Sequence, residues 1–350
     1  MGFDSTFVYK REKIMKKYLI PDGGKFYKAN LHMHTTISDG NMSLEETKKA
    51  FMEHGYSIVA FTDHEVMVPH TDLSDEKFLA ITSTEISMNI EVHAPFEYLK
   101  CYHLNLYSKD PLKDCFNTFT ESKMWLEHSK KYITEEQRNI KYIKTYSVEC
   151  VNDIIKKAKE EGCFVSYNHP VWSLQTYEDY IGLKGLWGVE WHNTGCVNAA
   201  YKDTFQPVED LLRLGERVYP LATDDAHNIG DCFGGWVMVK CANLEYDTVY
   251  NALENGDFYS SNGPEILSLS IQDGVVSVNT SKAKAIQLNT ERRITLFQNG
   301  VDLTEAQFDI NFYLNECKNN INKNQYIRIT VVDEKGNEAH SRAYFIDELL

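Results

Sequence analysis

The sequence predicts an α/β fold, with a parallel sheet or barrel followed by a small antiparallel β-sandwich. Short apolar runs alternate with amphipathic helical segments over residues 25–254, as in folds whose parallel strands are joined by helices. From Pro264 onward the pattern changes to short alternating segments separated by turns, one of them at Asn299-Gly300. We therefore expect two domains, residues 1–263 and 264–350.

Each expected element has a local signal. After a strand at 25–31, Ser43 and Glu46 form a capping box that begins a helix, and Gly55 ends it. Further strands of the first domain are expected at 57–62, 78–82, 101–107, 163–167, 186–191, 218–222 and 236–241, with helices at 147–161, 203–214 and 246–254. Strands of the second domain are expected at 266–271, 275–278, 286–288, 294–297, 308–314 and 326–332.

The composition excludes some classes of function. The formal net charge of −15 argues against a nucleic-acid-binding surface, which should be basic. No apolar run reaches about 18 residues, so we expect no membrane-spanning helix. The eight cysteines form no Cys-x-x-Cys pair, and we expect reduced thiols in a cytoplasmic protein.

The clearest chemical signal lies at the end of the first expected strand. His32 and His34 are two residues apart, so they project from the same face of a strand, and Asp39 follows on a loop. Two imidazoles and a carboxylate at one strand end are typical of a catalytic divalent-metal site. Taken alone, the pair is equally well interpreted as two half-buried strand histidines.

The other strand ends favour the metal site. Seven expected strands carry histidine, aspartate or glutamate at or just after their carboxyl ends. In barrels of parallel strands, active sites are built on that face. One polar residue there means little, but seven strand ends with such residues indicate a shared site.

The order of these residues resembles the motifs of the PHP superfamily, which is named after polymerase and histidinol-phosphatase domains. The resemblance covers residues 28–263, and the segment Gly256–Pro264 followed by a β-domain is similar to the stand-alone hydrolases related to CehA and McbA. It implies a distorted (β/α)7 barrel. The motifs that carry it are His32-x-His34 with Asp39, Asp63-His64, Glu85, His103, Asn168-His169-Pro170 and Asp225-x-His227.

The resemblance also implies three divalent metal ions. One ion would take His32, His34, Glu85 and Asp225. Glu85 would bridge to a second ion that also takes His103 and His169, and the third would take Asp39, His64 and His227. Sites of histidine and carboxylate without thiolate suit Mn²⁺, Fe²⁺ or Zn²⁺, and the sequence does not choose among them. We expect Glu85, Asp225 and His227 to take part in catalysis.

The charge balance predicts a hydrolytic mechanism. The nine expected ligands include three carboxylates, which cannot neutralise three divalent ions. The excess positive charge favours a bound hydroxide and an anionic substrate, so we expect metal-bound hydroxide to attack the phosphorus of a small phosphomonoester or phosphodiester. Residues expected to orient ligands or to contact substrate, or to be ordinary polar residues of the barrel, are Asp63, Asn168, Glu190, His192 and Asp224.

One departure from the family pattern concerns phosphate binding. Several PHP phosphatases carry an arginine shortly after the His-Pro motif, whereas Pro170 is followed here by Val171 and Trp172. Residues 108–146, which show no clear strand, are interpreted as an insertion that covers the mouth of the site. We expect Arg138 of this insertion to contact the substrate phosphate. Alternatively, Arg138 is a solvated surface charge.

Two other functions stay open. The first is hydrolysis of a carboxylic ester, amide or carbamate whose apolar leaving group stacks on Trp172, Trp187 or Trp191. The second is a non-enzymatic metal-binding module. We expect a small-molecule substrate and neither a nucleic-acid partner nor a membrane, and we make no prediction of the oligomeric state.

Overall fold

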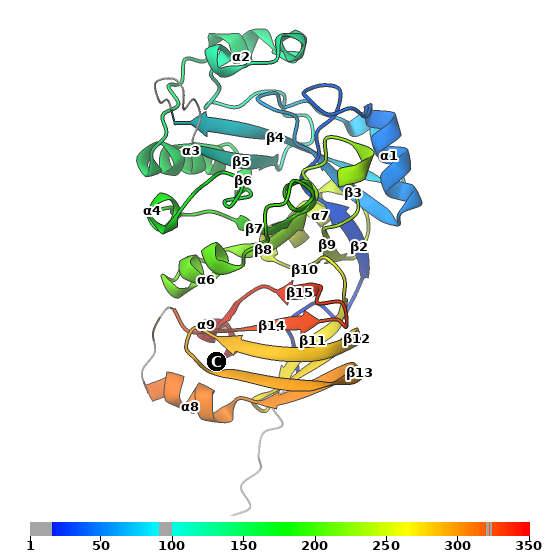
Figure 1. The fold of residues 1–350 in the computed structure, drawn as a ribbon, viewed down its shortest axis with the longest axis vertical. Helices are drawn as coiled ribbons and strands as arrows, with labels where there is room; N and C mark the ends of the chain where they lie inside the picture. The colour runs from blue at the N-terminus through cyan, green and yellow to red at the C-terminus, as the bar shows by residue number, and fades with distance from the viewer. Residues whose placement is uncertain (1–15, 91–99, 320–321, 323) are drawn as a thin grey trace, which may run out of the picture.

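The computed structural model describes residues 16–90, 100–319, 322 and 324–350. Within these ranges the protein has a mixed α/β fold with a large sheet (Figure 1). The strands are β1 (Lys17–Tyr18), β2 (Lys25–Asn30), β3 (Tyr56–Phe61), β4 (Leu79–Asn89), β5 (Cys101–Ser108), β6 (Cys163–Tyr167), β7 (Gly188–Asn193), β8 (Tyr219–Thr223), β9 (Trp236–Cys241), β10 (Phe258–Ser261), β11 (Ile266–Gln272), β12 (Val275–Thr290), β13 (Thr295–Asp309), β14 (Tyr326–Val332), β15 (Glu338–Ser341) and β16 (Tyr344–Phe345).

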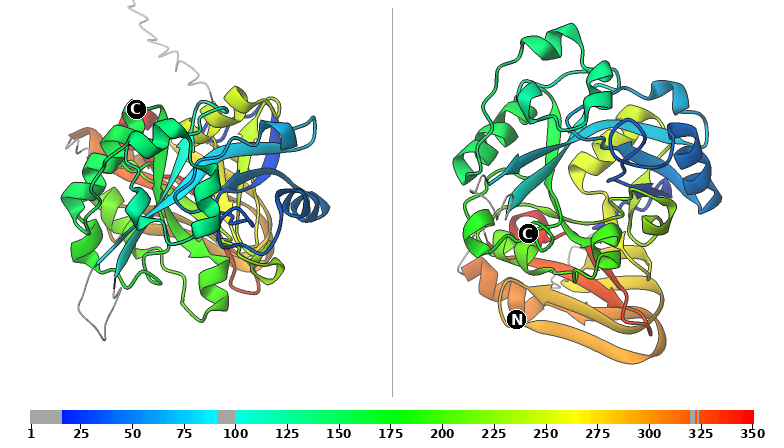
Figure 2. Two further views of the ribbon diagram at one scale, coloured as in Figure 1. Left: turned by 90° about the horizontal axis from the view of Figure 1, so that it is seen from above. Right: turned by 45° about the horizontal axis from the view of Figure 1, so that its top comes forward.

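The helices lie around the outside of the strands when the molecule is viewed along its long axis (Figure 2, left). The α-helices are α1 (Leu44–Glu53), α2 (Glu135–Asn139), α3 (Val148–Glu160), α4 (Tyr177–Tyr180), α5 (Thr194–Asn198), α6 (Gln206–Arg213), α7 (Tyr246–Asn255), α8 (Asn311–Asn319) and α9 (Ile346–Leu349). The 3-10 turns are η1 (Thr71–Leu73), η2 (Glu121–Lys123), η3 (Glu127–Tyr132) and η4 (Ile229–Asp231). None of the helices in the described ranges is long and apolar enough to cross a membrane.

One hydrogen-bonded sheet of 16 strands runs through the molecule. Its order is β1-β11-β12-β14-β15-β10-β9-β2-β3-β4-β5-β6-β7-β8, with β13 paired to β12 and β16 paired to β14. The last strand of this order, β8, also lies beside β9 and β10, so this part of the sheet curls back on itself. The hydrogen bonds between strands therefore do not divide the sheet into a separate barrel and a separate sandwich.

The predicted parallel arrangement holds for only part of the sheet. β2, β3 and β4 are parallel, and so are β6, β7 and β8. However, β5 is antiparallel to β4 and β6, and β9 is antiparallel to β2 and β10. The connection between β4 and β5, residues 90–100, is shorter than a parallel crossover requires, which explains the exception at β5.

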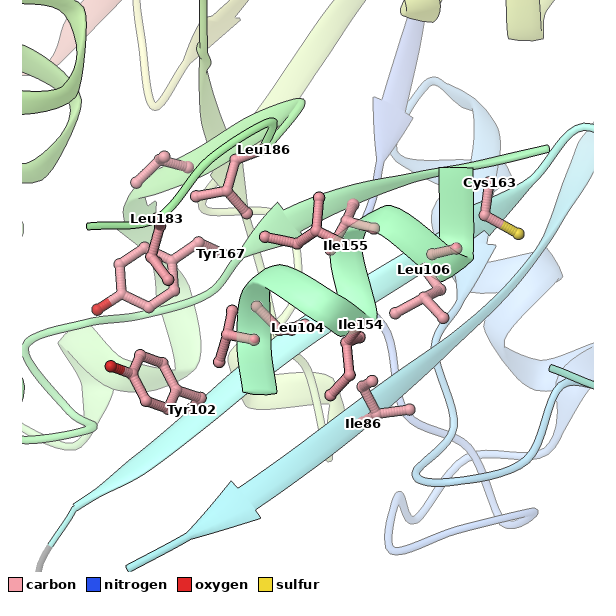
Figure 3. Packing of buried hydrophobic residues seen from close by; sticks show 14 of the residues in the cluster. Ile86, Tyr102, Leu104, Leu106, Ile154, Ile155, Cys163, Tyr167, Leu183 and Leu186 are labelled. Carbon is pink, nitrogen blue, oxygen red and sulfur yellow. The ribbon is translucent and has the colours of Figure 1, made fainter. Parts of the chain in front are cut away.

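Most expected elements of the first part form as predicted. Ser43 and Glu46 make the capping box of α1. Ser147 caps α3, whose Ile154 and Ile155 pack against Ile86 and the leucines of β5 (Figure 3). The amphipathic pattern of α3 therefore placed its apolar face correctly on the sheet that carries the site.

Residues 264–350 depart more from the prediction than the first part does. The predicted turn at Asn299-Gly300 is wrong, because this pair lies inside the long strand β13, where Asn299 pairs with Ala285 of β12. Pairing along β12 overrides the local turn preference of Asn-Gly. The end of the strand expected at 308–314 belongs instead to α8.

The sheet crosses the predicted domain boundary. β10, which ends at Ser261, pairs with β15 through Tyr259 and Ser341, and with β9 on its other side. The division into residues 1–263 and 264–350 thus stays a prediction, although the C-terminal strands gather at one end of the molecule (Figure 1).

A buried polar contact joins the two parts. Glu209 of α6 accepts hydrogen bonds from Tyr326 at 2.9 Å and from Nε of Arg328 at 2.6 Å. Arg328 is 8% exposed, so its charge depends on Glu209 rather than on water.

We expect Glu209→Ala to lower the free energy of unfolding by about 3 kcal/mol, because it leaves a buried guanidinium without its carboxylate. The measurement is urea denaturation followed by circular dichroism. The control is Glu254→Ala, which removes an exposed carboxylate from α7. Equal stability of the two variants would show that the contact between the parts contributes nothing.

Candidate metal centre

The chain brings all nine predicted ligands together. They come from strand ends at one edge of the sheet and from the loops that follow. His32, His34 and Asp39 follow β2, His64 follows β3, Glu85 lies in β4, His103 in β5, His169 follows β6, and Asp225 and His227 follow β8.

Short backbone contacts beyond the strands fix these positions. The amide of His34 donates to the carbonyl of Ala226 at 3.1 Å, and the amide of Asp225 donates to the carbonyl of His32 at 3.0 Å. An isolated parallel bridge joins His64 to Glu85. The ligands therefore lie on backbone that is tied to the sheet, as a precise metal site requires.

The antiparallel direction of β5 explains why its ligand stands near the beginning of the strand. His103 pairs with Ser87 of β4, two residues beyond Glu85. Because β5 runs opposite to β4, its first residues lie at the edge of the sheet where β4 ends. The prediction of a shared edge was correct, although the predicted strand direction was not.

The donor atoms form four overlapping groups, in each of which they lie within 4.8 Å of one another. These groups contain the nine predicted ligands and no cysteine of the described chain. They are His34 with Asp39, His64 and His227; His32 with His169 and Asp225; His32 with His34 and Glu85; and Glu85 with His103 and His169.

Glu85 stands between the groups, and both of its oxygens contact imidazoles, Oε1 lying 3.3 Å from His32 Nε2. Its Oε1 lies 3.1 Å from His103 Nδ1 and 3.3 Å from His169 Nε2. Its Oε2 lies 3.2 Å from His64 Nδ1 and 3.4 Å from His34 Nε2. A carboxylate in this position can serve two ions at once, and the bridging role of Glu85 stays a prediction.

The separations fit the coordination of divalent ions. Two donors bound at about 2.0–2.2 Å to one ion lie roughly 2.8–3.6 Å apart at octahedral or tetrahedral angles. His32 Nε2 and His34 Nε2 are 3.2 Å apart, and each is 3.2 Å from Asp225 Oδ1. His227 Nε2 is 3.3 Å from Asp39 Oδ2. The distances and the nitrogen and oxygen donors suit Mn²⁺, Fe²⁺ or Zn²⁺.

Buried partners orient the ligands. Glu190 Oε1 lies 2.7 Å from His32 Nδ1, which leaves Nε2 of that ring free to face the site. The amide of Asn168 donates to Glu85 Oε1 at 2.8 Å. Ser173 Oγ lies 3.1 Å from His169 Nδ1. Partners of this kind set the direction of a ligand and tune its basicity.

Two aspartates hold the loops of the site and do not contact the ligand imidazoles themselves. Asp63 accepts hydrogen bonds from the amides and hydroxyls of Thr35 and Ser38, and so holds the loop between His34 and Asp39. Asp224 accepts from Thr194 and from the amides of residues 233–235. Both carboxylates shape loops of the site, and neither contacts an imidazole of the ligand set.

Backbone strain accompanies the ligands. His169 has φ 27° and Asp225 has φ 49°, values that side-chain-bearing residues rarely adopt. Such conformations persist where the surrounding structure determines them, and they concentrate at functional sites. In both residues the strained backbone aims the side chain into the cluster.

The charges of the cluster depend on one another. Burial disfavours the imidazolium of His34, but Asp225 and Glu85 outweigh this effect and raise its pKa to about 10. Burial and the neighbouring His34 lower the pKa of His64 to about 3. Burial also opposes the ionisation of Glu85, but His103 and His32 outweigh it and hold the pKa of Glu85 well below its usual range. The buried carboxylates therefore require positive charge beside them.

The cluster forms the floor of a cavity of about 710 Å³. Glu85, His64 and Asp225 face it, and Trp125 and Trp172 stand among its walls. Among the described residues that line it there is no lysine or arginine. The size is that of a pocket for a small molecule.

The structure does not bring Arg138 to this cavity. Its guanidinium donates to Glu121 at 2.8 Å and to the carbonyl of Lys130 at 3.0 Å, on the exposed surface of the insertion. Arg138 is paired with a carboxylate of the same insertion, and its contact with substrate stays a prediction. The insertion reaches the site through Trp125 instead.

The other two residues predicted to contact substrate, Asn168 and His192, are also absent from the lining of the cavity. Asn168 is fully buried and holds Glu85. His192 lies 2.6 Å from Asp203 and 3.2 Å from Thr194, away from the cavity. Hydrogen bonds to other side chains hold Asn168 and His192, so neither side chain is directed toward a substrate in the cavity.

The sequence analysis missed Asn193 and Trp125. The amide of Asn193 donates to Glu190 at 3.0 Å and to Asp225 at 3.2 Å, and so links a ligand to an orienting residue. Its place three residues after Glu190, at the end of β7, was the available signal. Trp125 stands in the insertion, where no periodic pattern indicated its direction.

Comparison with known proteins gives distant similarities only. No family model matches the chain, and no curated protein is similar to it. A two-domain protein from Bacteroides vulgatus, containing a predicted PHP-like metal-dependent phosphoesterase, shares 13% identity over 94% of this chain and 98% of its own, with a TM-score of 0.44.

Two shorter matches cover 66% of this chain. An amidohydrolase from Chromobacterium violaceum has 14% identity, 96% coverage of its own chain and a TM-score of 0.40. A lesion-specific endonuclease from Pyrococcus furiosus has 15% identity, 56% coverage and a TM-score of 0.38. We therefore argue the function from the side chains of the site alone.

We expect Glu85→Gln to lose more than one equivalent of bound metal, because one charge serves both sides of the cluster. The measurement is elemental analysis after purification with Mn²⁺ or Fe²⁺. Glu149→Gln, an exposed change in α3, is the control. Wild-type metal content in Glu85→Gln would exclude Glu85 as the bridge.

We expect metal binding to release protons at about pH 7.5, because His34 with a pKa of about 10 is protonated in the metal-free protein and must be neutral to bind an ion. Affinity should then weaken as the pH falls. Calorimetric titration in two buffers of different ionisation enthalpy measures the proton count. Equal apparent enthalpies in both buffers would contradict the expectation.

Proposed function

We propose that this chain is a metal-dependent hydrolase that cleaves a small phosphoester at a site for three divalent ions. The single observation that carries the proposal is the cluster of six imidazoles and three carboxylates at the floor of an open cavity. Close packing of imidazoles supports the proposal, because His34 stacks on both His64 and His227 with ring centroids 4.4 Å apart, as rings that share metal ions can.

We assign the residues to three ions as the family resemblance implies. His32, His34 and Asp225 would hold one ion, His103 and His169 a second, and Asp39, His64 and His227 a third, with Glu85 shared between the first two. Divalent ions bound here would supply Lewis-acid chemistry, namely activation of water and stabilisation of charge on the ester oxygens.

Some side chains of the cluster are accessible from the cavity, and contacts within the chain hold them in position. The side chain of His227 is 34% exposed, against 12% for His103 and 9% for His64, so among these three imidazoles it is the most accessible from the cavity. Asp39 lies 3.3 Å from its Nε2 and fixes the ring. Asp225 faces His32, His34 and His169, which keeps it ionised despite burial.

The proposal includes the fold and subgroup that the sequence resembles. A distorted (β/α)7 barrel over residues 1–263 is supported by the return of β8 to β9 and β10. A β-sandwich over residues 264–350 and membership of the CehA- and McbA-like hydrolases complete it. The partner is a small molecule.

A second candidate is hydrolysis of a carboxylic ester, amide or carbamate at the same site. The absence of lysine and arginine from the described lining favours it, since a dianionic phosphate usually meets such side chains. Trp172 stands at the cavity, whereas Trp187 and Trp191 are buried and donate to Leu253 and Ser260. Of the three predicted stacking residues, only Trp172 can contact a substrate.

We expect the metal-loaded protein to hydrolyse p-nitrophenyl phosphate or bis-p-nitrophenyl phosphate, and a chelator to abolish turnover. Elemental analysis should give close to three ions per chain. Turnover of p-nitrophenyl acetate alone would favour the second candidate. Full activity with one ion or fewer would exclude the three-ion site.

A further inference from the structure

A second cavity lies at the opposite edge of the sheet from the metal centre. Its volume is about 490 Å³, which is enough for a small molecule. Phe164 is the second residue of β6, Trp187 directly precedes β7, and Tyr219 begins β8, so the cavity lies at the amino ends of these parallel strands. His169 and Asp225 of the metal centre follow the carboxyl ends of β6 and β8.

The length of the strands separates the two sites. Cys163 and Tyr167 are the first and last of the five residues of β6 (Figure 3). At about 3.3 Å per residue, this strand is roughly 16 Å long. A small molecule in the second cavity therefore does not contact the metal ligands.

Two lysines at the second cavity have no anionic partner in the described part of the chain. Lys109 directly follows β5, Lys159 lies in the last turn of α3, and both line the cavity. Neither ammonium group forms a hydrogen bond or an ion pair with a described residue. Other lysines nearby do pair with glutamates, namely Lys113, Lys156 and Lys184. In a chain with a formal net charge of −15, two free lysines beside one cavity indicate an anionic ligand.

The backbone beside the two lysines is held in place. The amide of Lys109 donates to the carbonyl of Gly162 at 2.9 Å, and the hydroxyl of Tyr250 donates to the same carbonyl at 2.9 Å. Gly185 leaves room for the other lysine, because a Cβ at this position would lie 3.1 Å from Nζ of Lys159. Both side chains thus start from fixed points, and their ammonium groups stay available to a ligand.

The remaining charged residues at the second cavity are Arg217 and Glu254. Arg217 is already paired with Asp347 and Glu348. Glu254 is the one acid among the described residues that line the cavity. The charge left for a ligand is therefore that of two lysines against one glutamate, opposite in sign to the charge of the whole chain.

The walls of the second cavity offer apolar contact. Phe164, Trp187 and Tyr250 line it and are otherwise buried. Trp187 Nε1 donates to the carbonyl of Leu253 at 2.9 Å, and the Tyr250 hydroxyl donates to Gly162, so both donors are already used. These rings can contact an apolar ring of a ligand, and they have no donor left for a polar one.

We propose that the second cavity binds a phosphate monoester whose body is an apolar ring. The two free ammonium groups match the nearly two negative charges that such a phosphate carries at neutral pH. The aromatic walls match the ring. Because the metal centre lies at the other edge of the sheet, this ligand is bound at the second cavity without being hydrolysed there.

The test uses the metal-loaded full chain and 1-naphthylphosphonate, a ligand that cannot be hydrolysed, with Kd measured by calorimetry at about pH 8, where lysines stay charged. We expect Lys109→Ala and Lys159→Ala each to weaken binding about fivefold, and Glu254→Gln to strengthen it about twofold. Inorganic phosphate, which lacks the ring, and 1-naphthalenesulfonate, which carries one charge, should each bind about fivefold more weakly than the phosphonate.

The matched control is Lys156→Ala, which removes the same charge from α3 at a position that does not line the second cavity. His103→Ala, with its metal content measured, tests the metal centre and should leave the lysine-dependent binding unchanged. Equal losses in Lys156→Ala and Lys159→Ala would show a general attraction of charge and overturn the proposal. Loss of all binding in His103→Ala, or no binding by the wild type, would overturn it as well.

Discussion

The site depends on a buried negative charge, the carboxylate of Glu85. It is 1% exposed and stands among five imidazoles, so water contributes almost nothing to its solvation. A lone carboxylate in such a place is strongly disfavoured, and the surrounding rings and any bound cations must supply the compensating charge. The positions of the six imidazoles follow from this requirement, because each lies within 4 Å of one of its two oxygens or of the neighbouring Asp225.

Side chains around the ligands hold the ligands in the positions that the buried charge requires. Glu190 and Asn168 orient His32 and Glu85 from buried positions, and Asp63 holds the loop that carries Asp39. These partners lie on the strand ends or just beyond, where the sheet limits their movement. The walls of the cavity are built differently, since Trp125 belongs to the insertion. The cavity is thus lined both by strand ends that carry the cluster and by the insertion.

The sequence predicted well which side chains gather at the site, because their signal is local. His32, His169 and Asp225 each follow an apolar run, and a strand end fixes where such a side chain goes. The direction of β5 and the long strand β13 were not predicted, since pairing between distant segments decided them. For a similar reason the sequence did not reveal that Arg138 lies away from the cavity. Its partner, Glu121, is 17 residues away, and a helical spacing cannot reveal that contact.

The pairing of β10 with β15 bears on how the chain can be divided. Ser260 and Ser261 are fully buried between β9 and β15. A fragment ending at residue 263 would keep every metal ligand but would present the free edge of β10 to solvent. Open edges of this kind pair readily with other chains. The C-terminal strands therefore act as a cover that protects the edge of β10 from pairing with other chains.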